Sequence, residues 1–385
     1  MAFANPFTPA FGSRPEHFYG RTSILSRVRS ALLGDRDVPD RVLFFTGPRG
    51  CGKTALLERL SQLAAECGWL TVDVHSVNAI QDILLGLSSA RGVRVSLAPE
   101  VKAFGATVAL GKADSAQPAS PGESPTTALL ACFDSLGRKR GVFITIDEIQ
   151  KIASGDMEQV CNAVQMARRK GRPVALMLAG LPGSKERVAS YPGCTFMQRV
   201  RDEHMGSLLV EETVEAFAQT LALVPSLVAP RDAVWAVAAY SQGYPYLVQL
   251  VGYHIINMLC EEYPVGELVL APEHVDAVAE EVYETYRQDV LVPSLRPLGT
   301  ESRAYLCAMA GLLDERGIAS TGAIARAMGK TLSQLSSRRQ TLIAHRLIRS
   351  AGYGKVSFGL PYLSRFVQEP VPEPNDLSSN EWIIR

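Results

Sequence analysis

The sequence lacks several features that would place the protein in a membrane or outside the cell. No apolar run reaches the roughly 18–20 residues that a membrane-spanning helix needs. The N-terminus shows no charged-then-apolar signal pattern. The seven cysteines, at 51, 67, 132, 161, 194, 260 and 307, are odd in number and form no CxxC pair, which argues against a disulfide framework and a structural zinc site. These absences predict a cytoplasmic protein with reduced thiols and no membrane partner.

Acidic residues are missing from one long stretch, Arg316 to Gln368. The formal net charge is zero, with 39 Lys and Arg against 39 Asp and Glu, and this balance alone argues against nucleic acid. Nine of the basic residues lie in the acid-free stretch, however, which leaves 30 against 39 acids elsewhere. Such segregation favours a negatively charged partner for this part of the chain.

The first half of the chain alternates apolar runs with helical patterns. The 385 residues predict two or three domains. Nearly continuous apolar segments are typical of buried parallel strands, and helical patterns lie between them, so we expect an α/β fold whose parallel sheet is covered on both faces. The expected strands are 41–47, 69–76, 141–148, 173–180 and, as a further candidate, 205–210; the expected helices are 53–67, 126–136 and 157–170. Segment 111–125, rich in Ser, Pro, Ala and Gly, is expected to be a mobile surface loop.

The stretch GPRGCGKT, residues 47–54, matches the phosphate-binding pattern GxxxxGK[ST] at every fixed position. An expected strand precedes it and an expected helix follows, which is the context that this pattern requires. Lys53 is expected to reach the β- and γ-phosphates of ATP, and the Thr54 hydroxyl to bind Mg²⁺. The predicted nucleotide-binding residues are Gly47, Pro48, Arg49, Gly50, Cys51, Gly52, Lys53, Thr54 and Ala55.

A second motif, the expected strand GVFITIDE, ends in two acids, Asp147 and Glu148. At the carboxyl end of a parallel strand, the first acid is expected to hold Mg²⁺ and the second to polarise the attacking water. A solvated acidic strand end is the ordinary alternative. Together with Lys53, the pair predicts an ATP hydrolase.

These motifs, with the helical segments that follow them, resemble an AAA+ ATPase. FYGR at 18–21 and GYPYLVQLVGY at 243–253 resemble the branch that holds origin-recognition initiators, archaeal-type ATPases and STAND signalling ATPases, over residues 16–261. The resemblance implies that Gly20, Arg21 and the turn Gly243-Tyr244-Pro245 border the adenine.

Two departures from the family pattern concern hydrolysis. The family's polar sensor after the fourth strand would fall near Ala179 and Gly180, which offer no such side chain, and no Arg stands in the turn at 243–245. We therefore expect slow, switch-like use of ATP. Arg199 or Arg201 is a candidate finger for a neighbouring copy's nucleotide in a homo-oligomer, although an exposed Arg is often only a surface charge.

The rest of the chain divides by pattern. We predict an α/β core over 1–210, a helical lid over 211–297, a winged helix-turn-helix over 298–367 and a tail over 368–385, with LVPSLRPLG at 291–299 as a proline-containing linker. The winged-helix pattern is three helical segments followed by two short strands around Gly352–Gly354. In the tail, residues 382–384 form an apolar trio that either docks on a partner protein or packs on its own surface.

In a winged helix the long third helix reads the major groove and the wing lies near phosphates. The candidate groove residues are Ser333, Gln334, Ser337, Arg338 and Thr341; the candidate wing residues are Arg349, Tyr353 and Lys355. Winged helices also serve as protein-contact modules, so two functions stay open. One is an ATP-controlled switch on duplex DNA, in an initiator, mobile-element or defence role; the other is a signalling ATPase whose winged helix contacts protein. A metabolic kinase is disfavoured because the sequence shows no acceptor-binding signature.

Overall fold

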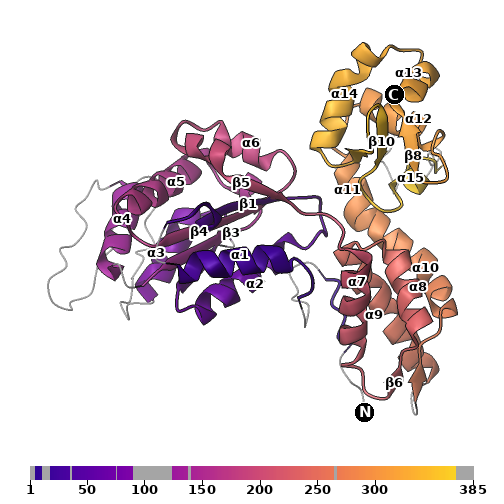
Figure 1. The fold of residues 1–385 in the computed structure, drawn as a ribbon, viewed down its shortest axis with the longest axis horizontal. Helices are drawn as coiled ribbons and strands as arrows, with labels where there is room; N and C mark the ends of the chain where they lie inside the picture. The colour runs from indigo at the N-terminus through magenta and orange to yellow at the C-terminus, as the bar shows by residue number, and fades with distance from the viewer. Residues whose placement is uncertain are drawn as a thin grey trace, which may run out of the picture. The chain divides into compact units, whose positions relative to one another are not determined.

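The computed structural model describes residues 5–10, 18–34, 37–74, 76–89, 124–137, 140–263 and 267–369 (Figure 1). The chain forms two compact units. The first unit consists of Phe18–Gly47 and Gly52–Met205; the second contains residues 5–10, Pro48–Cys51 and the chain from Gly206 onward. The expected loop at 111–125, except its last two residues, and the tail beyond 369 lie outside the described residues. None of the described helices combines the length and apolarity needed to cross a bilayer.

The first unit is built on a parallel sheet, as the sequence predicted. Its strand order is β2-β3-β4-β1-β5, and every neighbouring pair is parallel. The first four strands along the chain coincide with the expected apolar runs. The bounds are β1 Val42–Thr46, β2 Leu70–Val74, β3 Val142–Ile146, β4 Val174–Gly180 and β5 Arg201–His204.

Helices cover both faces of this sheet (Figure 1). Alternate strand residues, such as Val142, Ile144 and Ile146, pack into one buried cluster with α3, α4, α5, α6 and η3. The other face is covered by α1 and α2, which lie together in Figure 1. The bounds are α1 Thr22–Leu33, η1 Pro39–Arg41, α2 Lys53–Glu66, α3 Ala79–Ser89, α4 Pro125–Leu136, η2 Ile149–Lys151, α5 Ser154–Arg169, α6 Ser184–Ala189 and η3 Pro192–Arg199.

The last strand lies earlier than expected. The prediction of a strand at 205–210 is wrong, because the strand is β5, Arg201–His204, and helix α7 already begins at Val210. This strand sits at the edge of the sheet beside β1, so its side chains reach solvent and can be charged. The sequence RDEH contains no apolar run and was therefore not predicted to be a strand.

Helices dominate the start of the second unit, as predicted. Residues 291–299, expected as a linker, are largely helical: Leu291 and Val292 are buried, and Pro293 falls in the first turn of a helix, where proline is tolerated. The bounds are α7 Val210–Leu221, β6 Leu227–Val228, α8 Arg231–Ser241, α9 Pro245–Glu262, β7 Leu268–Val269, α10 Glu273–Tyr286, the π-helical η4 Arg287–Leu291 and α11 Val292–Leu295.

The C-terminal elements follow the order expected from the sequence, with two additions, strand β8 and the short final helix α15. A short strand, β8, precedes the second helix and completes an antiparallel sheet of order β8-β10-β9. Thr331 caps α14 through a reciprocal pair of hydrogen bonds with Gln334. The bounds are α12 Thr300–Ala310, β8 Ile318–Ser320, α13 Thr321–Ala327, α14 Leu332–Ala344, β9 Ile348–Ser350, β10 Lys355–Phe358 and α15 Leu363–Phe366.

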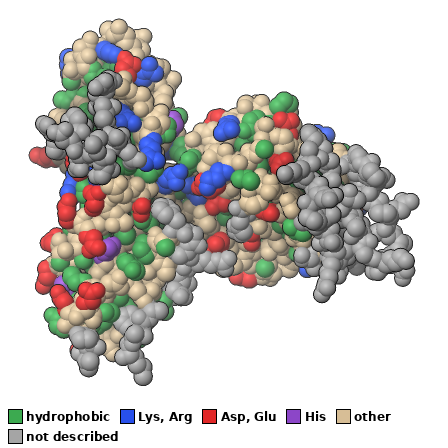
Figure 2. Space-filling model, turned by 180° about the vertical axis from the view of Figure 1, so that it is seen from behind, with side chains coloured by type: hydrophobic (Ala, Val, Ile, Leu, Met, Phe, Trp, Pro, Cys, Tyr) green, Lys and Arg blue, Asp and Glu red, His purple; other side chains and the backbone are tan. Residues whose placement is uncertain are grey.

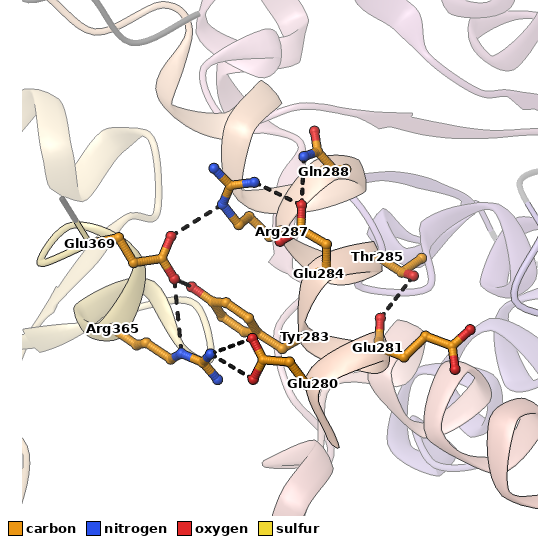
Figure 3. A network of polar contacts seen from close by, with 9 residues as sticks. All are labelled: Glu280, Glu281, Tyr283, Glu284, Thr285, Arg287, Gln288, Arg365 and Glu369. Atoms are coloured by element: carbon orange, nitrogen blue, oxygen red, sulfur yellow. Dashed lines mark hydrogen bonds and ion pairs between the residues drawn. The ribbon is translucent and has the colours of Figure 1, made fainter. Parts of the chain in front are cut away.

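A polar network fastens α15 to α10 within the second unit (Figure 3). The Arg365 guanidinium donates to both carboxylate oxygens of Glu280 at 2.8 Å and lies 3.6 Å from the centre of the Tyr283 ring. Glu369 accepts hydrogen bonds from the Tyr283 hydroxyl and, at 3.2 Å, from Arg287 Nε. The end of the described chain is therefore held on the helical elements by charge-assisted bonds.

Candidate nucleotide site and basic C-terminal surface

The turn between β1 and α2 has the backbone of a phosphate-binding loop. Gly50 and Gly52 adopt φ angles of +76° and +87°, which side-chain-bearing residues rarely adopt. Gly52 occupies the N-cap position of α2, where no side chain bonds the first amides and no acid lies in the first turn. The N–H groups at the start of α2 are thus suited to an anion.

Lys53 is buried, with 6% of its surface exposed. Its Nζ donates a hydrogen bond to the Gly47 carbonyl at 3.0 Å, within the first unit. A buried ammonium requires such a polar partner. The side chain thereby lies along the predicted loop, where a phosphate oxygen would supply a stronger, charge-assisted acceptor.

The sheet brings Thr54 and Asp147 into contact. Thr54 Oγ1 donates to Asp147 Oδ2 at 2.5 Å, and Asp147 Oδ1 accepts from the Glu148 amide at 2.7 Å. Mg²⁺ prefers oxygen ligands and is usually bound by one or two protein groups together with waters and substrate phosphates. A hydroxyl and a carboxylate in contact fit that ligand set, so these two residues could hold Mg²⁺.

Glu148 has an unusual backbone and a held side chain. Its φ is +48°, a left-handed conformation that is uncommon outside glycine. Its Oε2 accepts a hydrogen bond from Gln150 Nε2 at 2.6 Å and lies 3.6 Å from Lys151 Nζ. No sequence pattern predicted a role for Gln150. Its contacts in the folded chain are what indicate one.

The end of β4 carries no polar side chain, in line with the sequence. A Cβ at Gly180 would lie 2.7 Å from Ile149 Cγ2 and 2.8 Å from Ser184 Cβ, so no larger residue fits there. Gln150 Oε1 instead accepts from the Leu181 amide at 3.2 Å and from Ser184 Oγ at 3.4 Å. Gln150 thus connects Glu148 to the turn that follows β4 through hydrogen bonds.

The two candidate finger arginines differ in their surroundings. Arg201 forms an ion pair with Asp40 at 2.9 Å and lies 3.9 Å from Glu203. Arg199, the last residue of η3, is exposed and pairs with no acid in the described part of the chain. Arg199 is therefore the better placed of the two to reach a neighbouring molecule.

In the second unit, the turn residues 48–51 pack against the start of α9. The fully buried Tyr244 donates its hydroxyl to the Arg49 carbonyl, and the Tyr246 amide donates to the Gly50 carbonyl at 3.1 Å. Burial raises the pKa of Tyr244, which keeps the hydroxyl a protonated donor. A Cβ on Gly50 would come within 2.8 Å of Tyr246 Cβ, so the contact requires glycine.

The remaining residues assigned to the adenine take positions that suit a turn. Pro245 is the first residue of α9, a position at which proline is favoured. Gly20 and Arg21 adopt φ angles of +70° and +57° at the start of α1, in the first unit. Their assignment to the adenine stays a prediction.

The exposed face of α14 carries most of the predicted groove residues. Ser333, Ser337 and Arg338 are exposed and Thr341 is partly exposed, whereas Gln334 is already engaged in the helix cap. In the hairpin of β9 and β10, Tyr353 is fully exposed at the tip and Lys355 is exposed on β10, while Arg349 Nε donates to Ser357 Oγ at 3.0 Å. Helix α14 packs against β9, so its exposed residues and those of the hairpin belong to one packed group of C-terminal elements.

Acids from outside the acid-free stretch neutralise part of its charge. Glu301, on α12, pairs with Lys330 and with Arg338, the latter at 2.6 Å. The hydrogen bonds from Lys330 and Arg338 lower the pKa of Glu301 to about 2, so the carboxylate stays ionised at neutral pH. Arg365 is engaged by Glu280 and Glu369. In Figure 2, Lys and Arg are nevertheless prominent on the C-terminal elements at the upper left, while Asp and Glu predominate over the helical elements at the lower left.

Comparisons with known proteins agree with this architecture. Residues 17–184 match the AAA ATPase domain family, and residues 289–367 match a domain of unknown function, DUF8462. No curated protein matches the sequence. The chain is similar to the solved ORC2 protein of Aeropyrum pernix, both in its ADPNP–ADP complexes (TM-score 0.60, 14% identity) and in its ADP form (TM-score 0.54, 16% identity), each covering 93% of this chain and 95% of that chain.

The ORC1 protein of the same organism, solved in complex with DNA, aligns with a TM-score of 0.45 and 20% identity over 91% of this chain and 92% of that chain. Residues 17–184 thus match an AAA ATPase domain, and the chain shares its fold with ORC2. The expected fold class, a parallel α/β sheet with flanking helices, is confirmed.

Proposed function

We propose that this AAA+ chain binds and slowly hydrolyses ATP, and that ATP controls the binding of duplex DNA by a C-terminal winged helix. The observation that carries the ATPase part is the contact of Thr54 with Asp147 beside Glu148. The DNA part is supported by exposed basic residues on α14 and the wing. The ORC2 structures, solved with ADPNP and ADP, share the fold and are in line with a nucleotide switch.

Each site residue has a distinct task in the proposed hydrolysis. The Lys53 ammonium exchanges its bond with the Gly47 carbonyl for one with a phosphate oxygen. Thr54 and Asp147 supply oxygen ligands for Mg²⁺, which neutralises phosphate charge when bound. Glu148 orients the attacking water and accepts its proton. The absence of a polar side chain at the end of β4 accords with slow turnover.

Contacts within the second unit support nucleotide control of the C-terminal elements. Tyr244, which bonds the Arg49 carbonyl, lies edge-on to Tyr286 with ring centres 5.7 Å apart. The ring centres of Tyr286 and Tyr362 lie 6.5 Å apart. The Tyr362 hydroxyl donates a hydrogen bond to the Tyr240 main-chain carbonyl at 2.6 Å. A change at the phosphate-binding turn can therefore alter the packing against the C-terminal elements.

A signalling ATPase is the second candidate, and one observation favours it. The network of Figure 3 already commits α15 to contacts with α10, so the C-terminal elements make protein contacts in this structure. In that function the winged helix would hold an inactive state and DNA would play no part. The DNA measurements below separate the two candidates.

The test of DNA binding is fluorescence anisotropy of a labelled duplex titrated with the full chain in ATP, in ADP and without nucleotide. We expect tighter binding with ATP and weaker binding as salt rises, because contacts with phosphates release counterions. Lys355→Glu should weaken binding about tenfold by opposing the phosphate backbone. Glu301→Gln should strengthen it about threefold, since it releases Lys330 and Arg338.

The matched control is Arg231→Glu, which reverses an exposed charge at the start of α8, outside the C-terminal elements. It should leave DNA affinity within a factor of about two. Flat anisotropy in all three nucleotide states would reject DNA binding and favour the signalling candidate. Equal losses in the Lys355 and Arg231 variants would place the contact surface elsewhere.

Assembly is tested through Arg199. We expect Arg199→Ala to lower ATP turnover about tenfold or more, because a finger arginine stabilises charge that develops in the transition state. The control Arg169→Ala removes an exposed arginine at the end of α5 and should have no effect. Mixing the Arg199→Ala protein with a Lys53→Ala protein, which retains Arg199, should restore turnover if Arg199 acts on a neighbour's nucleotide. A mixture as slow as its components would contradict action between copies.

A further inference from the structure

We propose that Gln150 is a positioning residue for ATP hydrolysis, one that fixes the Glu148 carboxylate from the end of β4. This inference rests on the hydrolysis proposed above and adds a residue that neither the sequence motifs nor the comparisons assign. Gln150 lies on η2, two positions after Glu148, and its amide group bridges Glu148 and the turn that follows β4. All of these residues belong to the first unit.

The partners define the orientation of the Gln150 amide. The Leu181 main-chain N–H is a donor only, and it lies 3.2 Å from Gln150 Oε1. An ionised carboxylate is an acceptor only, and Glu148 Oε2 lies 2.6 Å from Gln150 Nε2. Rotating the amide by half a turn would face donor to donor and acceptor to acceptor. Gln150 therefore has one arrangement that satisfies both neighbours.

This arrangement prepares Glu148 for proton transfer. Gln150 and Lys151 both approach Oε2, at 2.6 and 3.6 Å, which leaves Oε1 to accept the proton of the attacking water. A general base must lie within hydrogen-bond reach of that proton, and a misplacement of about 1 Å can cost a hundredfold in rate. Glu148 has a left-handed backbone, which the surrounding structure must stabilise, and the hydrogen bond from Gln150 contributes to this.

The end of β4 has no room for a side chain that could perform this task. A Cβ at Gly180 would lie within 2.9 Å of Ser184 Oγ and closer still to Ile149. Gln150 reaches into the same place from η2 and uses the Leu181 amide and Ser184 Oγ as anchors. A displacement at the start of α6 would therefore be passed directly to Glu148.

The test is Gln150→Met, which keeps the length of the side chain and removes both hydrogen-bonding functions. We expect kcat for ATP to fall about tenfold while the Kd for ATP and the Tm change little, because the defect lies in positioning. Gln198→Met, at an exposed glutamine on η3, is the matched control and should behave as the wild type. In a Glu148→Gln background, Gln150→Met should cause no further loss, since Gln150 acts through Glu148.

The outcomes separate this inference from the function on which it rests. Wild-type turnover no faster than that of Glu148→Gln would reject the proposed hydrolysis itself, and the role of Gln150 with it. Normal turnover in Gln150→Met, beside a wild type that hydrolyses ATP, would overturn only the inference. A loss that persists in the Glu148→Gln background, or one accompanied by weaker ATP binding, would also overturn it, because both indicate a general structural role.

Discussion

Replacing Lys53 by Ala is expected to abolish ATP binding, with a loss of affinity of about 100-fold or more. The lysine is buried and its ammonium bonds the Gly47 carbonyl, so the charge is held at the turn rather than in solvent. Triphosphate needs that buried charge because the backbone N–H groups of the turn offer only partial charges. Titration of a fluorescent ATP analogue, with Mg²⁺ present, measures the effect.

Two further variants guard this result against loss of folding. Lys53→Met keeps the aliphatic stem that fills the buried site and should lose ATP as completely as Lys53→Ala. Lys170→Ala removes an exposed lysine that pairs with Asp134 at 3.1 Å in the same unit, and it should bind ATP normally. ATP affinity that survives in both Lys53 variants would mean that residues 47–54 do not hold the phosphates.

The parts of the site that the sequence predicted are those that depend on local order along the chain. Residues 47–54 lie between β1 and α2, and Asp147 and Glu148 directly follow β3. A buried strand followed by a glycine-rich turn or by acids has a pattern of its own, whatever the rest of the chain does. The four strands with apolar runs, β1 to β4, were predicted for the same reason.

What the sequence did not predict depends on contacts between distant segments. Gln150 has a role only because Leu181 and Ser184 come beside it after α5 and β4 have been placed. Similarly, an acid-free stretch of sequence does not imply an acid-free surface, since Glu301 reaches Lys330 and Arg338 from α12. Strand β5 was not predicted because its edge position leaves its side chains exposed, so it carries no apolar run.

The same distinction applies to the C-terminal elements. Their helices and hairpin were expected from caps, apolar spacing and a glycine-rich turn, all of them local signals. The attachment of α15 to α10 was not, because Glu280 and Arg365 have no pattern that pairs them in the sequence.

Replacing Glu148 by Gln is expected to lower ATP turnover about 100- to 10,000-fold while ATP stays tightly bound. The amide keeps the size of the side chain and still accepts a bond from Gln150, but it cannot take a proton from water. Thr54 and Asp147 are untouched, so the Mg²⁺ ligands proposed here remain. Single-turnover hydrolysis and nucleotide titration on the same preparation measure the two quantities separately.

Glu186→Gln, which neutralises an exposed acid on α6 in the same unit, provides the control and should hydrolyse ATP at the wild-type rate. The Glu148 variant also tests the switch, because a chain that retains ATP should keep the DNA affinity of the ATP state long after the wild type has reverted to the ADP state. Turnover that is unchanged in Glu148→Gln would remove this residue from the chemistry. If turnover is lost but DNA binding is not prolonged, the proposed hydrolysis by Glu148 stands. The proposed control of DNA binding is then rejected, since bound ATP has no effect on the C-terminal elements.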